Sequence, residues 1–378
     1  MFVPIANDPR GYAWGSTRLL ADYLRRTPSG GPEAELWLGA HPGSPSRVTG
    51  GEHLGLDLSQ AIEAAGRTQP VMLLKVLAAA EPLSLQAHPN AARARAGHER
   101  EDVAGIARDA PHRNYRDPFA KPELVVAVTP FEALSGFRPR EQAQGVAEAL
   151  AAVDARFGPL AEHVRSGDAL AWLLSGALEV RAAIAAASER SDAIAAALPD
   201  EADTIARLAA AHPGDPGILV ALLLNRVSLA PGEALYLPAG NLHAYLEGLG
   251  MELMGPSDNV LRGGLTSKHV DVDELLAIVD ETPLEDPRLP AMELDGAIAY
   301  RPEAPFELRL VEGTHRVGPG RALLLAISPT RIDVDGVTHE LDVAQAAWID
   351  TEVDFSVASD EAWLALECDT PEGSPPRP

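Results

Sequence analysis

Two histidines, a glutamate and a glutamine lie in segments that suit metal coordination: Gln86 and His88 in Leu-Gln-Ala-His-Pro, Glu123 in Lys-Pro-Glu-Leu, and His243 in Asn-Leu-His-Ala-Tyr. Side chains alternate between faces along an extended segment, so Gln86 and His88 should point the same way. Imidazole, carboxylate and amide donors without a thiolate suit zinc or another divalent first-row ion that keeps one position open. Either histidine alone would more commonly be an ordinary polar residue. The four together predict one metal site at which chemistry can occur.

Size, charge and cysteine content narrow the class of protein. The chain has 378 residues, 46% hydrophobic and 23% charged, which is enough for a large buried core. The formal net charge of -24 argues against nucleic acid or an anionic membrane as a partner, because both bind through basic surface. The single cysteine, Cys368, permits no intrachain disulfide. No signal-peptide pattern and no apolar run of membrane-spanning length is present, so we expect a cytoplasmic protein.

The first part of the chain, residues 1–139, has the texture of an all-β domain. Short β-type runs, such as 71–77 and 123–128, alternate with turns rich in glycine and proline. The exception is 90–107, where Asn90 can cap an Ala/Arg/Glu-rich stretch that predicts a surface helix. This helix should interrupt strands rather than build a bundle.

The composition changes sharply at Arg140. Residues 140–213 are rich in alanine and carry apolar residues at helical spacing, which predicts a helical insertion. Asp215 and Pro216 then provide a cap and a first-turn proline, which predict one more short helix over 218–225.

The β pattern returns directly after this short helix. Residues 226–240 contain a Pro-Gly turn between two β-type runs, which predicts a hairpin. We therefore expect residues 1–139 and 214–280 to form one discontinuous catalytic barrel. After a proline-rich linker, residues 281–370 should form a smaller β domain that weakly repeats the barrel and lacks a histidine equivalent to His243. Residues 371–378 are rich in Pro, Gly and Ser and are expected to be a disordered tail.

Several longer motifs carry a resemblance to a known family. The turn, strand, turn and histidine pattern that ends at His243 is typical of cupin barrels. The other motifs are Gln86-Ala-His-Pro, Arg113-Asn-Tyr-Arg-Asp-Pro, Lys121-Pro-Glu-Leu and Ser257-Asp-Asn-Val-Leu-Arg-Gly-Gly-Leu-Thr-Ser-Lys. With them, the chain closely resembles class I mannose-6-phosphate isomerases from Trp14 to about Asp271, and more loosely beyond. The resemblance implies a mainly β fold with a helical insertion: a double-stranded β-helix (cupin or jelly-roll) that binds the metal, and a second cupin-like β domain.

The resemblance also implies roles for individual residues. Its zinc ligands, for one ion per chain, are Gln86, His88, Glu123 and His243. The catalytic residues that it implies are Lys121, Glu252, Asp258 and Arg262, and the substrate-binding residues are Trp14, Lys75, Ser84 and Lys268. Because a sugar phosphate carries nearly two negative charges, several of these cations should converge on it in so acidic a protein.

The implied activity is aldose–ketose isomerisation between D-mannose 6-phosphate and D-fructose 6-phosphate, a step of mannose metabolism. A proton must move between C1 and C2 through an enediol, which needs a base and a positive charge facing the oxyanion. We expect zinc and its water to orient the sugar hydroxyls and Arg262 to stabilise the enediolate. Lys268, with Ser84 or Lys75, should hold the phosphate. Asp258 or Glu252 should assist ring opening and proton transfer.

The general base is left open by the sequence. Many members of the family carry a histidine directly before the Lys-Pro-Glu motif, whereas this chain has Ala120. An alanine cannot relay a proton, so either that histidine is dispensable or another group replaces it.

Two other functions fit parts of the pattern. A cupin oxygenase would hold iron with two histidines and a carboxylate, but it would leave Gln86 and the cationic residues without a role. A non-catalytic sugar-binding cupin would not need Asp258, Arg262 and Lys268 together at this spacing. The donor set alone does not separate zinc from manganese or cobalt. A monomer is the default, because the sequence shows no marked partner surface.

Overall fold

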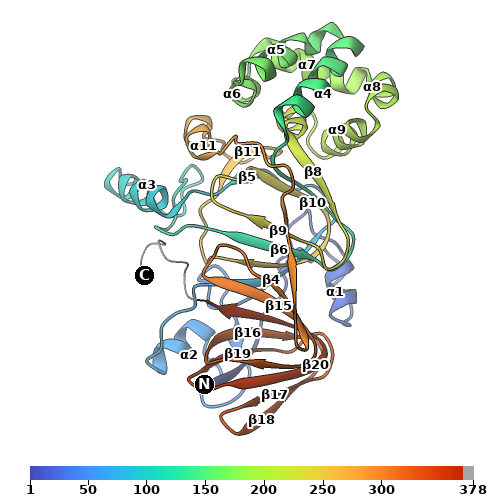
Figure 1. The fold of residues 1–378 in the computed structure, drawn as a ribbon. Coiled ribbons are helices and arrows are strands. Elements are labelled where there is room, and N and C mark those ends of the chain that lie inside the picture. The colour runs from blue at the N-terminus through green and yellow to red at the C-terminus, as the bar shows by residue number, and fades with distance from the viewer. Residues whose placement is uncertain (369–378) are drawn as a thin grey trace.

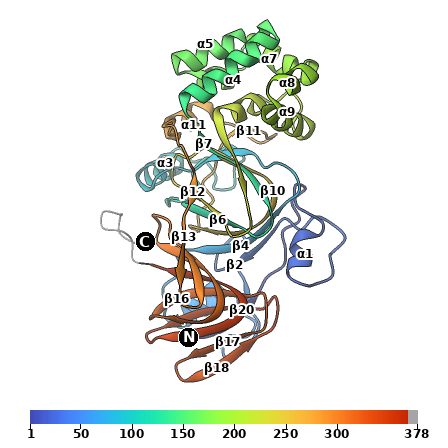
Figure 2. The same ribbon diagram turned by 45° about the vertical axis from the view of Figure 1, so that its right-hand side comes forward.

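The computed structural model describes residues 1–368, which form two ten-stranded antiparallel sheets and a group of helices. Figure 1 shows the helices of residues 140–211 at one end, the first sheet in the middle and the second sheet at the other end. The same order along the long axis is visible in Figure 2. The predicted class, mainly β with helices, is confirmed. The expected disordered tail, residues 371–378, lies outside the described residues.

The first sheet is built around one long strand. Its members are β2 (Glu35–Leu38), β4 (Leu73–Ala79), β5 (Leu85–Ala87), β6 (Glu123–Ala127), β7 (Phe131–Phe137), β8 (Leu224–Leu229), β9 (Ala234–Leu237), β10 (His243–Met254), β11 (Leu261–Gly264) and β12 (Arg288–Leu289). The first half of β10 pairs with β5 and β7, and the second half pairs with β4 and β6. At the junction Gly248 has φ +123°, and a Cβ there would lie 2.7 Å from Phe131, so the bend requires glycine.

Both faces of the first sheet are buried, and they differ in character. Along β4, Leu74 and Val76 contribute to an apolar core shared with the second sheet. The alternate residues Lys75 and Leu77 face the inside of the first sheet. An apolar run that carries one charge at an inward position is therefore the local sequence signature of the enclosed pocket.

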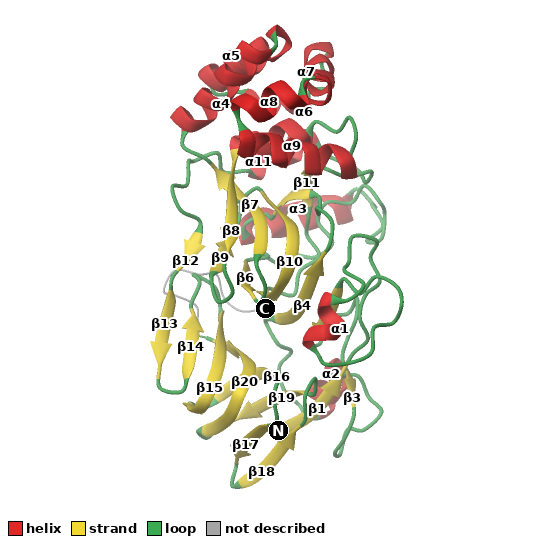
Figure 3. Ribbon diagram, turned by 90° about the vertical axis from the view of Figure 1, so that its right-hand side faces the viewer, coloured by secondary structure: helices red, strands yellow, loops and turns green. Residues whose placement is uncertain are grey.

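The second sheet contains both the first and the last strand of the described residues. It contains β1 (Phe2–Ala6), β3 (Arg47–Val48), β13 (Ala291–Leu294), β14 (Ala297–Tyr300), β15 (Phe306–Val317), β16 (Gly320–Ala326), β17 (Thr330–Val334), β18 (Val337–Leu341), β19 (Ala346–Thr351) and β20 (Phe355–Glu367). Figure 3 shows these strands below those of the first sheet. Trp348 and Trp363 pack into the core that the two sheets share.

The sheets depart from the expected division in two places. We expected residues 1–139 to lie entirely in the first barrel, but β1 pairs with β19, and β3 pairs with β1. Val3 and Ile5 of β1 are buried in the shared core, which fixes this strand on the second sheet. In the other direction, β12 pairs with β9 of the first sheet although it follows residue 281. Pairings between segments so distant in sequence leave no local pattern that reveals them.

The helices after Arg140 cover one end of the first sheet. They are α4 (Arg140–Val153), η1 (Ala155–Phe157), α5 (Gly158–Ser166), α6 (Ala169–Leu174), α7 (Leu178–Glu189), α8 (Ser191–Ala197) and α9 (Pro199–Ala211). Their apolar faces pack in one core with residues of β5, β7, β10 and β11. The predicted short helix is present as α10 (Gly217–Val220) and η2 (Ala221–Leu223).

The hairpin predicted over residues 226–240 is wrong. β8 pairs with β7, whereas β9 pairs with β6 and β12, so the Pro-Gly turn carries the chain from one set of partners to another. The predicted surface helix is confirmed as α3 (Ala91–Val103), in which Asn90 caps the N-terminus by accepting from the Arg93 N–H. The remaining helices are α1 (Leu19–Tyr23), α2 (Leu58–Ala64) and α11 (Val272–Ile278). Among the described residues, no helix has the length and apolar character needed to cross a membrane.

Candidate metal centre

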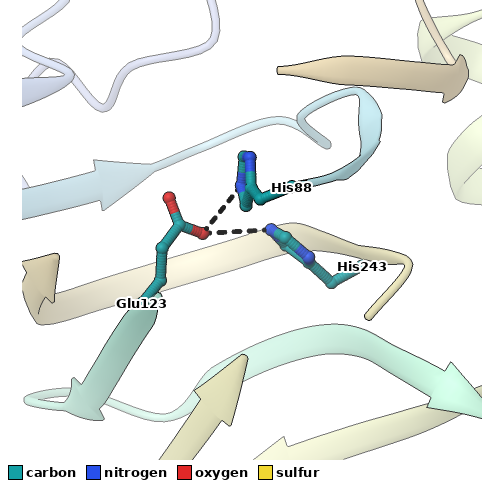
Figure 4. A group of neighbouring side chains, drawn as sticks. All are labelled: His88, Glu123 and His243. Carbon is teal, nitrogen blue, oxygen red and sulfur yellow. Dashed lines mark ion pairs between the residues drawn. The ribbon is translucent and has the colours of Figure 1, made fainter. Parts of the chain in front are cut away.

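Three of the four predicted ligands meet in one buried group. Nε2 of His88 and Nε2 of His243 each lie 3.2 Å from Oε2 of Glu123. All three side chains are at most 2% exposed. Figure 4 shows the two rings and the carboxylate pointing toward one another from separate segments. These donor atoms lie within 4.8 Å of one another, close enough to share one ion.

The sheet brings the three residues together. His243 is the first residue of β10, Glu123 is the first residue of β6, and His88 follows directly after β5. His243 pairs with Gln86 at the start of β10, whereas Glu123 pairs with Met254 at the other end of that strand. The first sheet must therefore curve to bring Glu123 within 3.2 Å of His243.

Backbone carbonyls determine which ring nitrogens face the group. Nδ1 of His88 lies 2.7 Å from the carbonyl oxygen of Asn259, and Nδ1 of His243 lies 3.1 Å from that of Asn241. A carbonyl can only accept, so each Nδ1 carries the proton and each Nε2 presents a lone pair. This is the usual orienting contact of a metal-binding histidine.

The buried polar atoms of residues 1–368 that have no hydrogen-bond partner include three acceptors of this group: Nε2 of His88, Nε2 of His243 and Oε2 of Glu123. Three lone pairs facing one another without a donor are unfavourable, because each has lost its water. A divalent cation bound between them would satisfy all three. Two imidazoles and a carboxylate match a zinc site that keeps an open position.

Electrostatics keep this group deprotonated. Burial lowers the pKa of His88 to about 4, although the charge of Glu123 acts in the opposite direction. For Glu123, burial alone would raise the pKa. The neighbouring imidazole and the ammonium of Lys121, whose Nζ lies 2.9 Å from Oε1, hold that pKa well below its usual range. At neutral pH both side chains are therefore in the form that a metal ion requires.

Gln86, the fourth predicted ligand, lies in a row with two other site residues. Its Cα is paired with that of His243 on one side and with that of Arg262 on the other. Directly opposed residues of antiparallel strands project to the same face. The structure thus puts the side chains of Gln86, Arg262 and His243 on one face, and a metal bond from Gln86 stays a prediction.

Lys75 and Glu252 form a charged network deeper in the pocket. Lys75 Nζ lies 3.0 Å from Oε2 of Glu252, 3.4 Å from Oε1 of Glu35 and 4.7 Å from the centre of the Trp37 ring. Trp37 in turn donates from Nε1 to Glu35 at 3.0 Å. Burial and the charges of Glu123 and Glu35 raise the pKa of Glu252, against the effect of Lys75. A carboxyl group with a raised pKa holds a proton more readily than an ordinary glutamate does.

Arg262 and Lys268, the predicted phosphate-side cations, lie near a third cation that the sequence analysis missed. Burial lowers the pKa of Lys268, and the charges of Arg262 and Arg116 add to this effect. Burial, followed by the charge of Arg116, likewise lowers the pKa of Arg262. In residues 1–368 none of the three side chains makes an ion pair, unlike Lys75 and Lys121. The position of Arg116 in the Asn-Tyr-Arg-Asp motif was the available signal.

The remaining predicted residues, Asp258, Trp14 and Ser84, are partly buried. Asp258 is half-exposed, and its N–H donates to Oδ2 of Asp117 at 2.8 Å. Trp14 is partly buried against the apolar cluster inside the first sheet. Ser84 is also partly buried and directly precedes β5. His41, which lies 3.5 Å from Asp258, was not predicted and had no local signal beyond a histidine following a β-type run.

Comparison with known proteins places this geometry in a family. The model of the family described as "Phosphomannose isomerase type I, catalytic domain" matches residues 2–140. Mannose-6-phosphate isomerase of Salmonella typhimurium is 39% identical over 298 residues, which cover 74% of this chain and 75% of the relative. The Escherichia coli protein of that name is 40% identical over 296 residues, or 73% and 74% of the two chains. The chain belongs to the mannose-6-phosphate isomerase family.

Solved structures of mannose-6-phosphate isomerases extend the similarity to nearly the whole chain. A structure of mannose 6-phosphate isomerase bound with zinc and yttrium superposes with a TM-score of 0.87 and 31% identity, covering 97% of this chain and 99% of that one. The apo form of mannose 6-phosphate isomerase from Salmonella typhimurium also matches with a TM-score of 0.87 and 31% identity, covering 97% of this chain and 99% of that one. The similarity therefore includes the helices and the second sheet as well as the metal centre.

Proposed function

We propose that this protein is a mannose-6-phosphate isomerase that binds one zinc ion and interconverts D-mannose 6-phosphate and D-fructose 6-phosphate. The observation that carries the proposal is the group of buried, donor-free acceptors on His88, Glu123 and His243. Relatives of that name at 39% and 40% identity support it, as does a matching structure described as zinc bound. Gln86, on the same face as His243, completes the proposed ligand set.

The residues around the metal centre have separate proposed roles. When bound, zinc supplies a Lewis acid that polarises the sugar oxygens. Arg262, Lys268 and Arg116 are cations without carboxylate partners in residues 1–368, so they are free to bind the phosphate and the developing oxyanion. Ser84 and Trp14 border the substrate.

Glu252 is the proposed acceptor for the C2 proton, because its pKa is raised. Lys75 is held between Glu252 and Glu35, so it acts on Glu252 rather than on the phosphate. Lys121 stabilises the ionised form of Glu123 and faces the substrate beside it.

The finer architecture is also proposed. Residues 7–46, 49–139 and 214–280 supply most of a double-stranded β-helix barrel, and residues 140–213 form a helical insertion into it. Residues 291–368, with β1 and β3, form the second cupin-like unit, whereas β12 of the preceding segment pairs with the first. We further propose that the enzyme acts as a monomer in the cytoplasm on a small sugar phosphate.

A coupled assay that reports fructose 6-phosphate tests the activity. The purified protein should convert mannose 6-phosphate, lose activity after dialysis against a strong chelator, and recover it with stoichiometric zinc. A chelated protein that keeps full turnover would exclude the metal role. Activity that requires iron and dioxygen would instead favour the oxygenase alternative.

A further inference from the structure

A buried histidine outside the metal group contacts a carboxylate at the edge of the pocket. His41 follows β2, and its side chain is only 3% exposed. Its Nε2 lies 3.5 Å from Oδ1 of Asp258, whose side chain is 40% exposed. In residues 1–368 the Asp258 carboxylate has no other ion pair or hydrogen bond. The accessible member of the pair is thus the aspartate, and the imidazole lies behind it.

The loop backbone fixes the tautomer of this imidazole. The N–H of Gly43 donates to Nδ1 of His41 at 3.0 Å, so the neutral ring carries its proton on Nε2, which faces Asp258. Burial lowers the pKa of His41, and the ring is therefore neutral at pH 7. A neutral ring held beside a carboxylate at this distance limits the orientation of the carboxylate.

His41 also connects Asp258 to the charged interior of the pocket. Its ring lies edge-on to Trp37, with 5.0 Å between centroids, and Lys75 Nζ lies over the same indole. On the other side, Asn259, the neighbour of Asp258, orients His88 of the metal group. The charged groups that act on the His41 ring are Asp258, Lys75, Asp117 and Lys121. Arg10 also lies close by, over the Trp37 ring, and donates to the Gly43 carbonyl.

We propose that His41 is a positioning residue of the isomerase: its Nε2 side holds the Asp258 carboxylate in place and directed at the sugar hydroxyls during ring opening. Asp258 accepts the proton of the anomeric hydroxyl, the C1–O5 bond breaks to give the C1 aldehyde, and O5 takes a proton from water at the open mouth. The resulting hydroxide then removes the proton from Asp258. Ala120 has no group that could perform this transfer. The inference rests on the proposed function and adds a residue to it.

Two amide variants separate the two contacts of the ring. In His41→Asn the side-chain oxygen can replace Nδ1 and accept from Gly43, but it no longer reaches Asp258. In His41→Gln the longer side chain can place its N–H near Asp258, but it leaves Gly43 without its acceptor. We expect His41→Asn to lower kcat by at least about tenfold with unchanged zinc content, and His41→Gln to retain kcat within about threefold.

A double-mutant cycle provides a readout that a purely structural role would not move. In an Asp258→Asn background, His41→Asn should cause no further loss, because the two residues act as one unit.

Three results would overturn the inference: His41→Asn with near-normal kcat, equal losses in both amide variants, or losses that multiply in the double variant. If His41→Asn loses zinc or melts early, His41→Gln decides, since a folded but inactive His41→Gln contradicts the role and an active one supports it. An inactive wild-type protein would instead contradict the proposed function itself.

Discussion

Buried histidines of both sheets place Nδ1 against a backbone carbonyl, but their other ring nitrogen, Nε2, has different partners in the two sheets. In the second sheet, Nε2 of His315 lies 2.7 Å from Nη1 of Arg309, while Nδ1 contacts the carbonyl of Asp295. In the first sheet, Nε2 of His88 and of His243 face only the acceptor Oε2 of Glu123. His315 is satisfied by the protein alone. The other two histidines require something that the polypeptide does not supply.

The contrast extends to the sheet interiors. The enclosed side of the second sheet is filled with aliphatic residues such as Leu324, Ile332 and Ile349, together with Phe355. The corresponding space in the first sheet contains Lys75 and the carboxylates that surround it. Buried charges contribute little net stability even when they are paired. We infer that the second sheet supplies packing, through its own interior and the shared core, that the polar pocket of the first sheet cannot.

The largest expected difference between the two histidine environments concerns metal. His88→Ala should lose bound zinc and reduce kcat/KM by more than about 100-fold. Replacing a residue that only orients a metal ligand typically lowers activity by up to about 100-fold, and removing the ligand itself should lower it further. The matched change in the second sheet is His315→Gln, which should keep zinc at one ion per chain. Metal analysis of the purified proteins with a parallel activity assay measures both. Stoichiometric zinc in His88→Ala would remove the distinction.

The second test changes the interior of the second sheet and leaves the metal centre intact. Leu324→Ala removes a fully buried side chain from the second sheet and should lower the free energy of unfolding by about 2–5 kcal/mol. Below the unfolding transition, kcat and KM should remain near wild type, because Leu324 lies in a separate core cluster from the metal centre. Denaturant unfolding followed by fluorescence, with kinetics at low temperature, checks the prediction. A change in KM without a change in stability would contradict it.

The sequence revealed what is local in this fold and missed what is distant. Asn90 at the start of α3 and the alanine-rich helices after Arg140 were predictable because capping and helical spacing act within a few residues. The placement of β1 on β19 was not, since it depends on a contact between residues more than 340 positions apart. The Pro-Gly turn was interpreted as a hairpin because turn chemistry says nothing about which strands pair.

The candidate site follows the same rule. His88, Glu123 and His243 were predictable from residue type and motif, and the structure brings them together. Arg116 was missed although it lies in the Asn-Tyr-Arg-Asp motif, and His41 was missed because a single histidine in a loop carries no spacing signal. Their importance arises only from the neighbours that the fold gives them, Arg262 in one case and Asp258 in the other.

Acidification should lower the free energy of unfolding of the metal-free protein, because His88 is buried in its neutral form. Burial places the pKa of His88 at about 4, below the ordinary value of 6.5. Between these pH values the unfolded chain binds a proton that the folded chain does not, so stability falls as the pH falls from 6.5 to 4. For the apo protein the loss should be on the order of 3 kcal/mol from this residue. Unfolding curves of apo protein at several pH values measure it.

The control for this pH effect is the His88→Gln variant. Its amide does not titrate, so the apo variant should lose less stability than the wild type over the same interval. An identical pH dependence in the two proteins would assign the acid sensitivity to other groups.

The smallest expected effect is on KM, and it should distinguish a cation without an ion-pair partner, Arg116, from a paired one. Arg116 has no ion-pair partner in residues 1–368 and lies close enough to Arg262 to lower its pKa. Arg116→Ala should raise KM for mannose 6-phosphate by about 3- to 10-fold and leave kcat within about twofold, because a charge-assisted contact to phosphate is lost from both ground and transition states. Arg331, paired at 3.0 Å with Asp333 on the exposed face of the second sheet, is the matched control, and Arg331→Ala should change neither constant.

Raised ionic strength should weaken substrate binding more in wild type than in Arg116→Ala. Equal salt sensitivity in the two proteins, with an unchanged KM, would show that Arg116 does not contact the phosphate.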